Sequence, residues 1–209
     1  MEGKTVLDYG CGPGYKSLEY INSGASRVIG IDISKKFIET ALSQCKDLNI
    51  DRESYDFIEM DAHDLQFRDD SFDVVIGYAI LHHLDTSVAL KEIHRVLKPN
   101  GRVLLLEPLA DNPVLKLFRR ATPGIRTVDE RPFTGKDIKN MFSAQLWERQ
   151  MKYCGVLEAP FAVLTSILMP EHENNFILRF ADRIERWLHA NNLFLSWNQY
   201  VLFDCLKKG

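Results

Sequence analysis

The stretch TVLDYGCGPG, residues 5–14, places Asp8 two residues before the first of three alternating glycines, Gly10, Gly12 and Gly14. Its first residues are typical of a short buried β-strand, and the glycines form the loop that follows. A loop made of glycines can bring its backbone close to a bound molecule, and it can also turn through positive φ values that other residues avoid. The stretch therefore predicts either a ligand-binding loop or only a tight turn.

Short apolar stretches alternate with helical patterns over the first hundred residues. Ser34 is placed to cap one of these helices and Asp85 another. Repeated strand–helix–strand units predict a parallel sheet with right-handed crossovers, and hence a doubly wound α/β domain. The predicted strands lie at residues 6–7, 28–31, 55–60, 72–76 and 102–106.

Two further aspartates, Asp32 and Asp61, lie at the ends of the second and third predicted strands. In an open parallel sheet, ligands bind outside the carboxyl ends of the strands. There Asp32 can accept hydrogen bonds from both hydroxyls of a ribose, and Asp61 can accept one from the exocyclic amine of adenine. Together they predict that a nucleoside is held at its sugar and at its base.

The spacing of the glycines indicates which chemical group the ligand carries beside its nucleoside. A dinucleotide fingerprint has the pattern G-x-G-x-x-G, with the pyrophosphate at the start of the helix. This loop is G-x-G-x-G, and the carboxylate of Asp8 is unfavourable beside a pyrophosphate. It suits the ammonium group of an amino acid, with a sulfonium nearby. An NAD-dependent oxidoreductase is the less favoured alternative.

Composition restricts the partners that we expect. A net charge of −3 and a pI near 6.1 give no general attraction to nucleic acid or to anionic lipid. The four cysteines lack C-x-x-C spacing, and no signal peptide or membrane-spanning run is recognisable. The histidines share no metal-ligand spacing. We therefore expect a cytoplasmic protein without metal, nucleic-acid partner or membrane span.

Five segments, taken in order, resemble the successive motifs of class I S-adenosylmethionine-dependent methyltransferases, most closely the small-molecule enzymes of type 11. They cover most of the first half of the chain. The segments are VLDYGCGPG (6–14), IGIDIS (29–34), MDAHDL (60–65), FDVVIGYAILHHL (72–84) and LKEIHRVLKPNGRVLLLEP (90–108).

The resemblance implies the architecture of the whole chain. It implies a Rossmann-like sheet of seven strands, mostly parallel with an antiparallel last strand and with helices on both faces. Residues 1–209 would form a single methyltransferase domain. Within it, residues 1–108 would be the cofactor-binding half, and residues 109–209 would supply the substrate side and the last strands.

The resemblance also implies which residues surround the methionine part of S-adenosylmethionine. Asp8, Gly10 and Gly12 would line it. Gly14 would lie close behind, and Tyr78 would close the methionine end. A tyrosine that only packs at the end of a strand is the alternative for Tyr78.

For the nucleoside part, the same resemblance gives four residues. Asp32 would hold the ribose, and Ile33 would lie beside the adenine. Asp61 and Ala62 would meet the edge of the base. S-adenosylhomocysteine would be the product.

The methyl acceptor would be an oxygen or nitrogen of a small molecule. His82, His83 and Glu107 follow or end the fourth and fifth predicted strands, so each is a candidate base for removing the acceptor's proton. Packing is the alternative for either histidine, and a structural hydrogen bond is the alternative for Glu107. A homodimer is compatible with the sequence.

One departure from the family concerns the segments that cover the cofactor. The first predicted strand begins a few residues after Met1, whereas relatives carry preceding helices that form a lid. We expect residues 108–133 and 158–190 to supply the cover. The alternative is a catalytically silent module that binds S-adenosylmethionine and serves a partner protein.

The second half of the chain predicts fewer features. Residues 146–157 and 197–206 are expected to form the last strands. Residues 176–188 follow the pattern of an amphipathic helix. Its aromatic side chains are expected in the core beneath these strands, with an apolar acceptor site or a partner-binding surface as alternatives.

Overall fold

A computed structural model of the chain describes residues 1–113, 116, 131–142, 146–157, 161, 176–191 and 193–208. The described part contains one sheet of seven strands in the order β3-β2-β1-β4-β5-β7-β6. The strands are β1 (Thr5–Tyr9), β2 (Arg27–Asp32), β3 (Tyr55–Glu59), β4 (Phe72–Tyr78), β5 (Leu97–Pro108), β6 (Trp147–Cys154) and β7 (Tyr200–Lys207).

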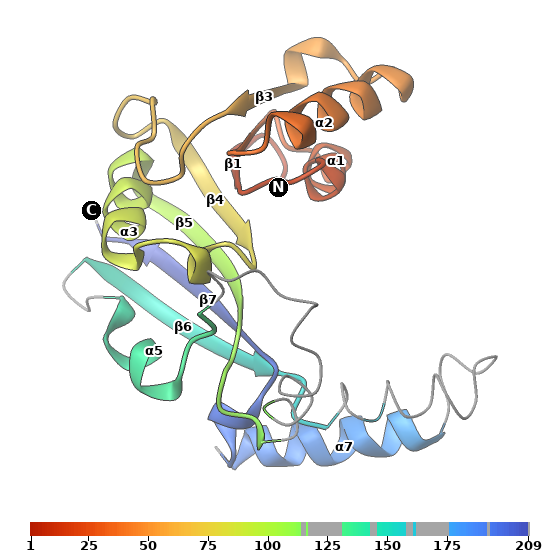
Figure 1. Cartoon of the computed structure of the whole chain (residues 1–209), viewed down its shortest axis with the longest axis vertical. Coiled ribbons are helices and arrows are strands. Elements are labelled where there is room, and N and C mark those ends of the chain that lie inside the picture. The colour runs from red at the N-terminus through yellow and green to blue at the C-terminus, as the bar shows by residue number, and fades with distance from the viewer. Residues whose placement is uncertain are drawn as a thin grey trace. The chain divides into compact units, whose positions relative to one another are not determined.

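The helices described between these strands are α1 (Tyr15–Asn22), α2 (Lys35–Asp47), α3 (Thr86–Val96), α5 (Gly135–Met141) and α7 (Phe176–Ala190) (Figure 1). Short 3₁₀ turns lie at Arg52–Ser54, Leu81–His83 and Leu195–Trp197.

The first five strands form the parallel part of the sheet. β1 pairs in parallel with β2 and β4, β2 with β3, and β4 with β5. The last strands are antiparallel. This confirms the doubly wound, mostly parallel sheet of seven strands.

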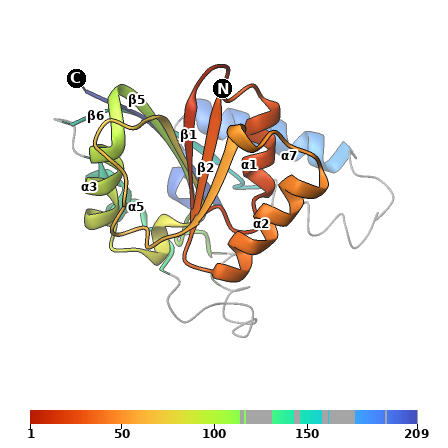
Figure 2. The same ribbon diagram turned by 90° about the horizontal axis from the view of Figure 1, so that it is seen from above.

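Helices cover both faces of this parallel part. Figure 2 shows α1 and α2 on one side of β1 and β2, with α3 on the other side. Apolar side chains of α2 join Tyr55 and Phe57 of β3 in one buried cluster, against which Leu18 and Ile21 of α1 pack. The core therefore lies between the sheet and its helices, and the carboxyl ends of β1, β2 and β4 are left to the connecting loops.

Local sequence signals explain where the helices begin. The side chain of Ser34 accepts a hydrogen bond from the backbone N–H of Phe37, and Asp85 accepts from Ser87 and Val88. Both caps confirm the predicted starts of α2 and α3, since a polar side chain satisfies backbone donors that have no partner in the helix.

Boundaries differ from the expected ones at two strands. β3 ends at Glu59, so Asp61 lies in the following turn and not in the strand. β5 begins at Leu97, which is earlier than expected, because the turn around Gly101 is taken into the strand.

The chain divides into two compact units. The first comprises residues 1–106, 141–150 and 203–209, and the second comprises residues 107–140 and 151–202. The first unit contains the whole of β1 to β4, most of β5, the start of β6 and the end of β7. A single methyltransferase domain over residues 1–209 stays a prediction.

Helix α7 forms where its periodicity predicts, but it buries a different face. The expectation that its aromatic residues lie in the core is wrong for Phe176, Phe180 and Trp187, which are 68%, 63% and 59% exposed. The buried residues of α7 are Ala181 and Glu185. Most of the segments expected to cover the cofactor, within 108–133 and 158–190, lie outside the described residues.

Candidate functional site

The three glycines after β1 all have positive φ, but their missing side chains serve different purposes. A Cβ at Gly10 would come within 2.7 Å of the Ile80 side chain, and one at Gly14 within 2.7 Å of Ala41. A Cβ at Gly12 would meet nothing within 4 Å. Gly10 and Gly14 therefore allow close packing of the protein, while Gly12 leaves its backbone open to an approaching ligand.

The backbone donors of this loop are already used. Gly10 and Cys11 donate to the carbonyl of Ile31, and Gly14 donates to the carbonyl of Cys11. Gly12 donates to the Oδ2 atom of Asp32 at 2.9 Å, and the proline at position 13 has no N–H. The amides of residues 10–14 are therefore engaged within the protein.

Asp8 lies directly beneath the loop and is 3% exposed. Its Oδ2 atom accepts a hydrogen bond from the hydroxyl of Ser17 on α1. Burial, and then the charge of Asp32, raise the pKa of Asp8 to about 6, against the lowering effect of the Ser17 hydrogen bond. A cation that came to lie beside this carboxylate would offset the cost of its burial.

Asp32, at the end of β2, holds the loop in place. Its Oδ2 atom accepts from Gly12, and its Oδ1 atom accepts from the backbone of Ser34 at 2.8 Å. Ile33, between them, is 75% exposed. A large apolar side chain that is left in solvent beside a polar edge can pack on a flat ring such as adenine.

The turn after β3 is organised by His63. The Oδ1 atom of Asp61 accepts from the backbone N–H and from the ring Nδ1 of His63, both at 2.8 Å. The ring Nε2 accepts from the backbone N–H of Asp85 at 2.9 Å, which places the ring hydrogen on Nδ1. The backbone hydrogen bond, followed by the side-chain one, lowers the pKa of Asp61. His63 therefore ties the candidate adenine-binding turn to the start of α3.

Ala62 is held in place by a hydrogen bond from β1. Its carbonyl accepts a hydrogen bond from the hydroxyl of Tyr9 at 2.6 Å. Tyr9 is fully buried in β1, and this burial raises the pKa of its phenol. A neutral phenol that donates to the turn holds residues 61 and 62 at the edge of the sheet.

The remaining predicted residues differ in their accessibility. Tyr78, the last residue of β4, is 50% exposed. His82 is buried while His83 is exposed, and their rings lie 4.1 Å apart. Glu107 is fully buried and belongs to the second unit. Among the three candidate bases, only His83 is open to solvent.

Sequence reasoning missed four residues of this site: Tyr9, Ser17, His63 and Ile80. Each acts on a predicted residue from a position that spacing does not reveal. His63 was the easiest to find, because it stands directly after Asp61 and Ala62 in the quoted segment MDAHDL. In a tight turn, a histidine two residues after an aspartate can form hydrogen bonds with the carboxylate of that aspartate.

Comparison with known proteins identifies what this arrangement belongs to. Residues 7–105 match the family model described as "Methyltransferase domain". The chain contains a class I S-adenosylmethionine-dependent methyltransferase domain. The matched range includes every predicted cofactor residue, from Asp8 to Tyr78.

Individual relatives support the same assignment. The methyltransferase domain is similar to a protein of Lactococcus lactis named demethylmenaquinone methyltransferase, with 33% identity over 150 residues, which are 70% of this chain and 58% of that protein. The crystal structure of YcgJ from Bacillus subtilis superposes with a TM-score of 0.67 at 25% identity, covering 100% of this chain and 94% of that one.

A third similarity shows the fold alone. It is to phosphoethanolamine N-methyltransferase 2 of Haemonchus contortus, solved in complex with S-adenosylmethionine, with a TM-score of 0.68, 18% identity, and 99% of this chain and 49% of that one covered. The chain spans between 44% and 58% of the length of the first five curated relatives that it matches.

The described residues show neither a metal-binding cluster nor a membrane-spanning helix. Over the described residues, no three or more His, Cys, Asp or Glu side chains are grouped so that they could hold a metal ion. No helix in the same part of the chain has both the length and the apolar character needed to cross a membrane.

Proposed function

We propose that this chain methylates an oxygen or nitrogen atom of a small-molecule acceptor, using S-adenosylmethionine. The observation that carries the proposal is the loop at Gly12. There the backbone is open to a ligand, the N–H groups of Gly10, Cys11, Gly12 and Gly14 are used within the protein, and the carboxylate of the neighbouring Asp8 is buried. Such a surface favours a cation over a phosphate.

The residues of the first unit fit this cofactor. Asp8 would bind the ammonium group, and Gly12 would contact the methionine part. Asp32 would accept from the ribose hydroxyls with the lone pairs that its two backbone bonds leave free. The exposed side chain of Ile33 would pack on the adenine, whose edge Asp61 would meet.

When bound, S-adenosylmethionine supplies an electrophilic methyl group whose in-line transfer leaves a neutral thioether. The chain therefore needs no acid for the leaving group. Its residues have to position the acceptor, exclude water and, for a hydroxyl or a protonated amine, remove a proton. We assign this last role to His83 in preference to His82 and Glu107, because it alone is exposed.

A binding comparison tests the cofactor first. Calorimetry should show binding of S-adenosylmethionine and S-adenosylhomocysteine and none of NAD. Asp32→Ala should weaken binding by about 1–3 kcal/mol, because the ribose hydroxyls lose a charged acceptor. Preferential binding of NAD, or an unchanged affinity of the variant, would contradict the assignment.

Turnover is tested separately. Release of S-adenosylhomocysteine would be measured over a panel of small hydroxyl and amine acceptors. Demethylmenaquinone, which is named in a relative, would be measured separately, because it lacks a methyl group on a ring carbon and turnover on it would contradict an oxygen or nitrogen acceptor. His83→Ala should lower kcat more than it changes the cofactor affinity. Tight cofactor binding without release on any acceptor would favour the silent module that serves a partner.

A further inference from the structure

Helix α7 has an inward face that is fixed by specific contacts. Ala181 and Glu185 are 1% and 4% exposed. The two carboxylate oxygens of Glu185 accept from the backbone N–H groups of Gly155 and Leu157, at 2.6 and 2.9 Å. These bonds hold the helix in one rotation about its axis, and the opposite face is therefore turned to solvent.

That outward face carries a line of aromatic side chains. Phe176, Phe180 and Trp187 are separated by four and seven residues, so they lie along one stripe of the helix. Each is at least 59% exposed. Single exposed apolar residues are common on proteins, but three large rings on one face of a helix indicate an interaction surface.

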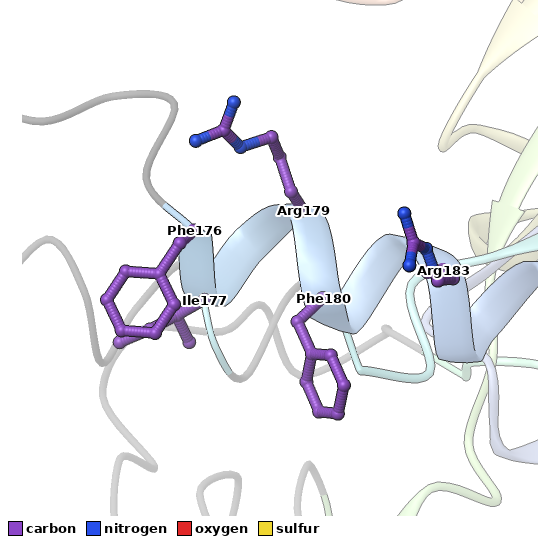
Figure 3. A pocket seen from close by; sticks show the side chains of 5 residues that line it. All are labelled: Phe176, Ile177, Arg179, Phe180 and Arg183. Atoms are coloured by element: carbon purple, nitrogen blue, oxygen red, sulfur yellow. The ribbon is translucent and has the colours of Figure 1, made fainter.

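Arginines run beside this stripe. Arg179 and Arg183 are exposed, and within the described residues neither takes part in an ion pair. Arg186 is paired with Asp182 at 2.6 Å. In Figure 3 the rings of Phe176 and Phe180 extend toward one edge of the helix, and both guanidinium groups extend toward the other.

A hollow adjoins this part of the helix. A cavity of about 660 Å³ is lined, among the described residues, by Phe176, Ile177, Arg179, Phe180 and Arg183. The outward surface of α7 thus combines exposed rings, room for an apolar group and a local positive charge, although the chain as a whole has a net charge of −3.

We propose that this face of α7 docks onto the surface of an anionic lipid bilayer. Aromatic rings favour the interface between acyl chains and headgroups, and arginines beside them reach lipid phosphates. The charge of the outward face complements an anionic leaflet, because Glu185 is buried and the one other acidic residue of the helix, Asp182, is paired. The proposal is independent of the proposed methyl transfer, and it would place the chain at a lipid surface without crossing it.

Vesicle sedimentation tests this proposal on the full chain without cofactor. We expect binding to vesicles of phosphatidylcholine with about one third phosphatidylglycerol, and little binding to phosphatidylcholine alone. Binding should fall as salt is raised, because exposed charges are screened.

Two double variants separate the charged from the apolar contribution. Arg179→Glu with Arg183→Glu should reduce partitioning at least tenfold, since each arginine near an anionic surface contributes about fivefold. Phe176→Ser with Phe180→Ser should reduce it as well. Matched changes on α2, Lys35→Glu with Lys36→Glu and Phe37→Ser, alter exposed residues of the same kinds and should leave partitioning nearly unchanged.

Three kinds of result would overturn the proposal. The first comes from the vesicles: equal binding to neutral vesicles, no binding to either kind of vesicle, or an equal loss of binding in the α2 controls. The second is self-association of the wild type that the serine variant abolishes, which would make a second copy the occupant. The third is a lower unfolding temperature of the serine variant than of Phe37→Ser, which would show that the chain itself covers the rings.

Discussion

At the scale of single residues, the role that we propose for Asp8 comes with a cost in stability. Its folded pKa of about 6 lies above the ordinary value of 3.8, chiefly because the carboxyl is buried. The folded state therefore binds this proton more tightly than the unfolded state does. The resulting stabilisation is fully present below about pH 4 and is lost as the pH rises through about 6.

Asp8→Asn removes this cost while keeping an acceptor for Ser17. Without ligand at pH 7.5, we expect the variant to gain about 1–3 kcal/mol in its free energy of unfolding, measured by urea denaturation. The gain should shrink as the pH falls through 6 toward 4 and vanish well below the ordinary value of 3.8, where the wild-type carboxyl is protonated in both states. The same variant should bind S-adenosylmethionine about tenfold or more weakly, because the ammonium loses its counter-charge. A less stable variant that binds normally would contradict both roles.

The glycines give a second prediction at this scale. Gly10→Ala would place a Cβ 2.7 Å from Ile80, so it should destabilise the protein, and a further Ile80→Ala change should recover part of the loss in a double-mutant cycle. Gly12→Ala meets no protein atom and should cost only about 1–2 kcal/mol, from its positive φ. It should still weaken cofactor binding in calorimetry, because its methyl group enters the open space. Normal binding by Gly12→Ala would show that the ligand lies elsewhere.

Residue spacing alone predicted the acidic residues and glycines of the candidate site, because each stands in a short segment next to a strand end. Ser17 and Ile80 were not found, because their contacts with Asp8 and Gly10 depend on how a helix and a neighbouring strand pack. The division of roles among the three glycines was likewise hidden. It depends on Ile80 and Ala41, which only the tertiary structure brings near.

At the scale of elements, β5 and β7 are joined by a partly buried ion pair. The Nε and Nη2 atoms of Arg102 donate to the two carboxylate oxygens of Asp204, at 2.6 and 2.7 Å. Asp204 is 8% exposed, whereas the arginine side chain is 51% exposed. Loss of the arginine would leave a nearly buried carboxylate without its cation.

Arg102→Leu should therefore lower the free energy of unfolding by about 1–3 kcal/mol in urea denaturation. Changing both residues to leucine should cost less than changing the arginine alone, because the nearly buried carboxylate is removed together with the arginine. Lys16→Leu is the matched control, since it breaks the exposed pair with Glu19 and should change stability little. Equal effects of the two single changes would refute a special role for the β5–β7 pair.

The elements also show which part of a pattern is informative. The 3.6-residue period located α7, but it assigned the aromatic stripe to the core. The period depends only on where apolar residues fall. It cannot predict that Glu185 lies on the buried face, where its carboxylate accepts hydrogen bonds from two backbone N–H groups of the segment after β6. For α2 and α3 the same reasoning succeeded, because their capping residues lie next to them in the sequence.

At the scale of the whole molecule, the residues predicted to bind cofactor fall within residues 1–106 and hence within the first of the two compact units. A ligand that binds only the native form stabilises it in proportion to the logarithm of its concentration, by about 2.7 kcal/mol at a hundred times its Kd. We therefore expect saturating S-adenosylhomocysteine to slow amide hydrogen exchange over residues 8–14, 30–34 and 60–63. Exchange in α7, which belongs to the second unit, should stay unchanged, and anionic vesicles should slow it there without cofactor. Protection of α7 by S-adenosylhomocysteine alone would contradict this separation, because it would make the aromatic face part of the cofactor site.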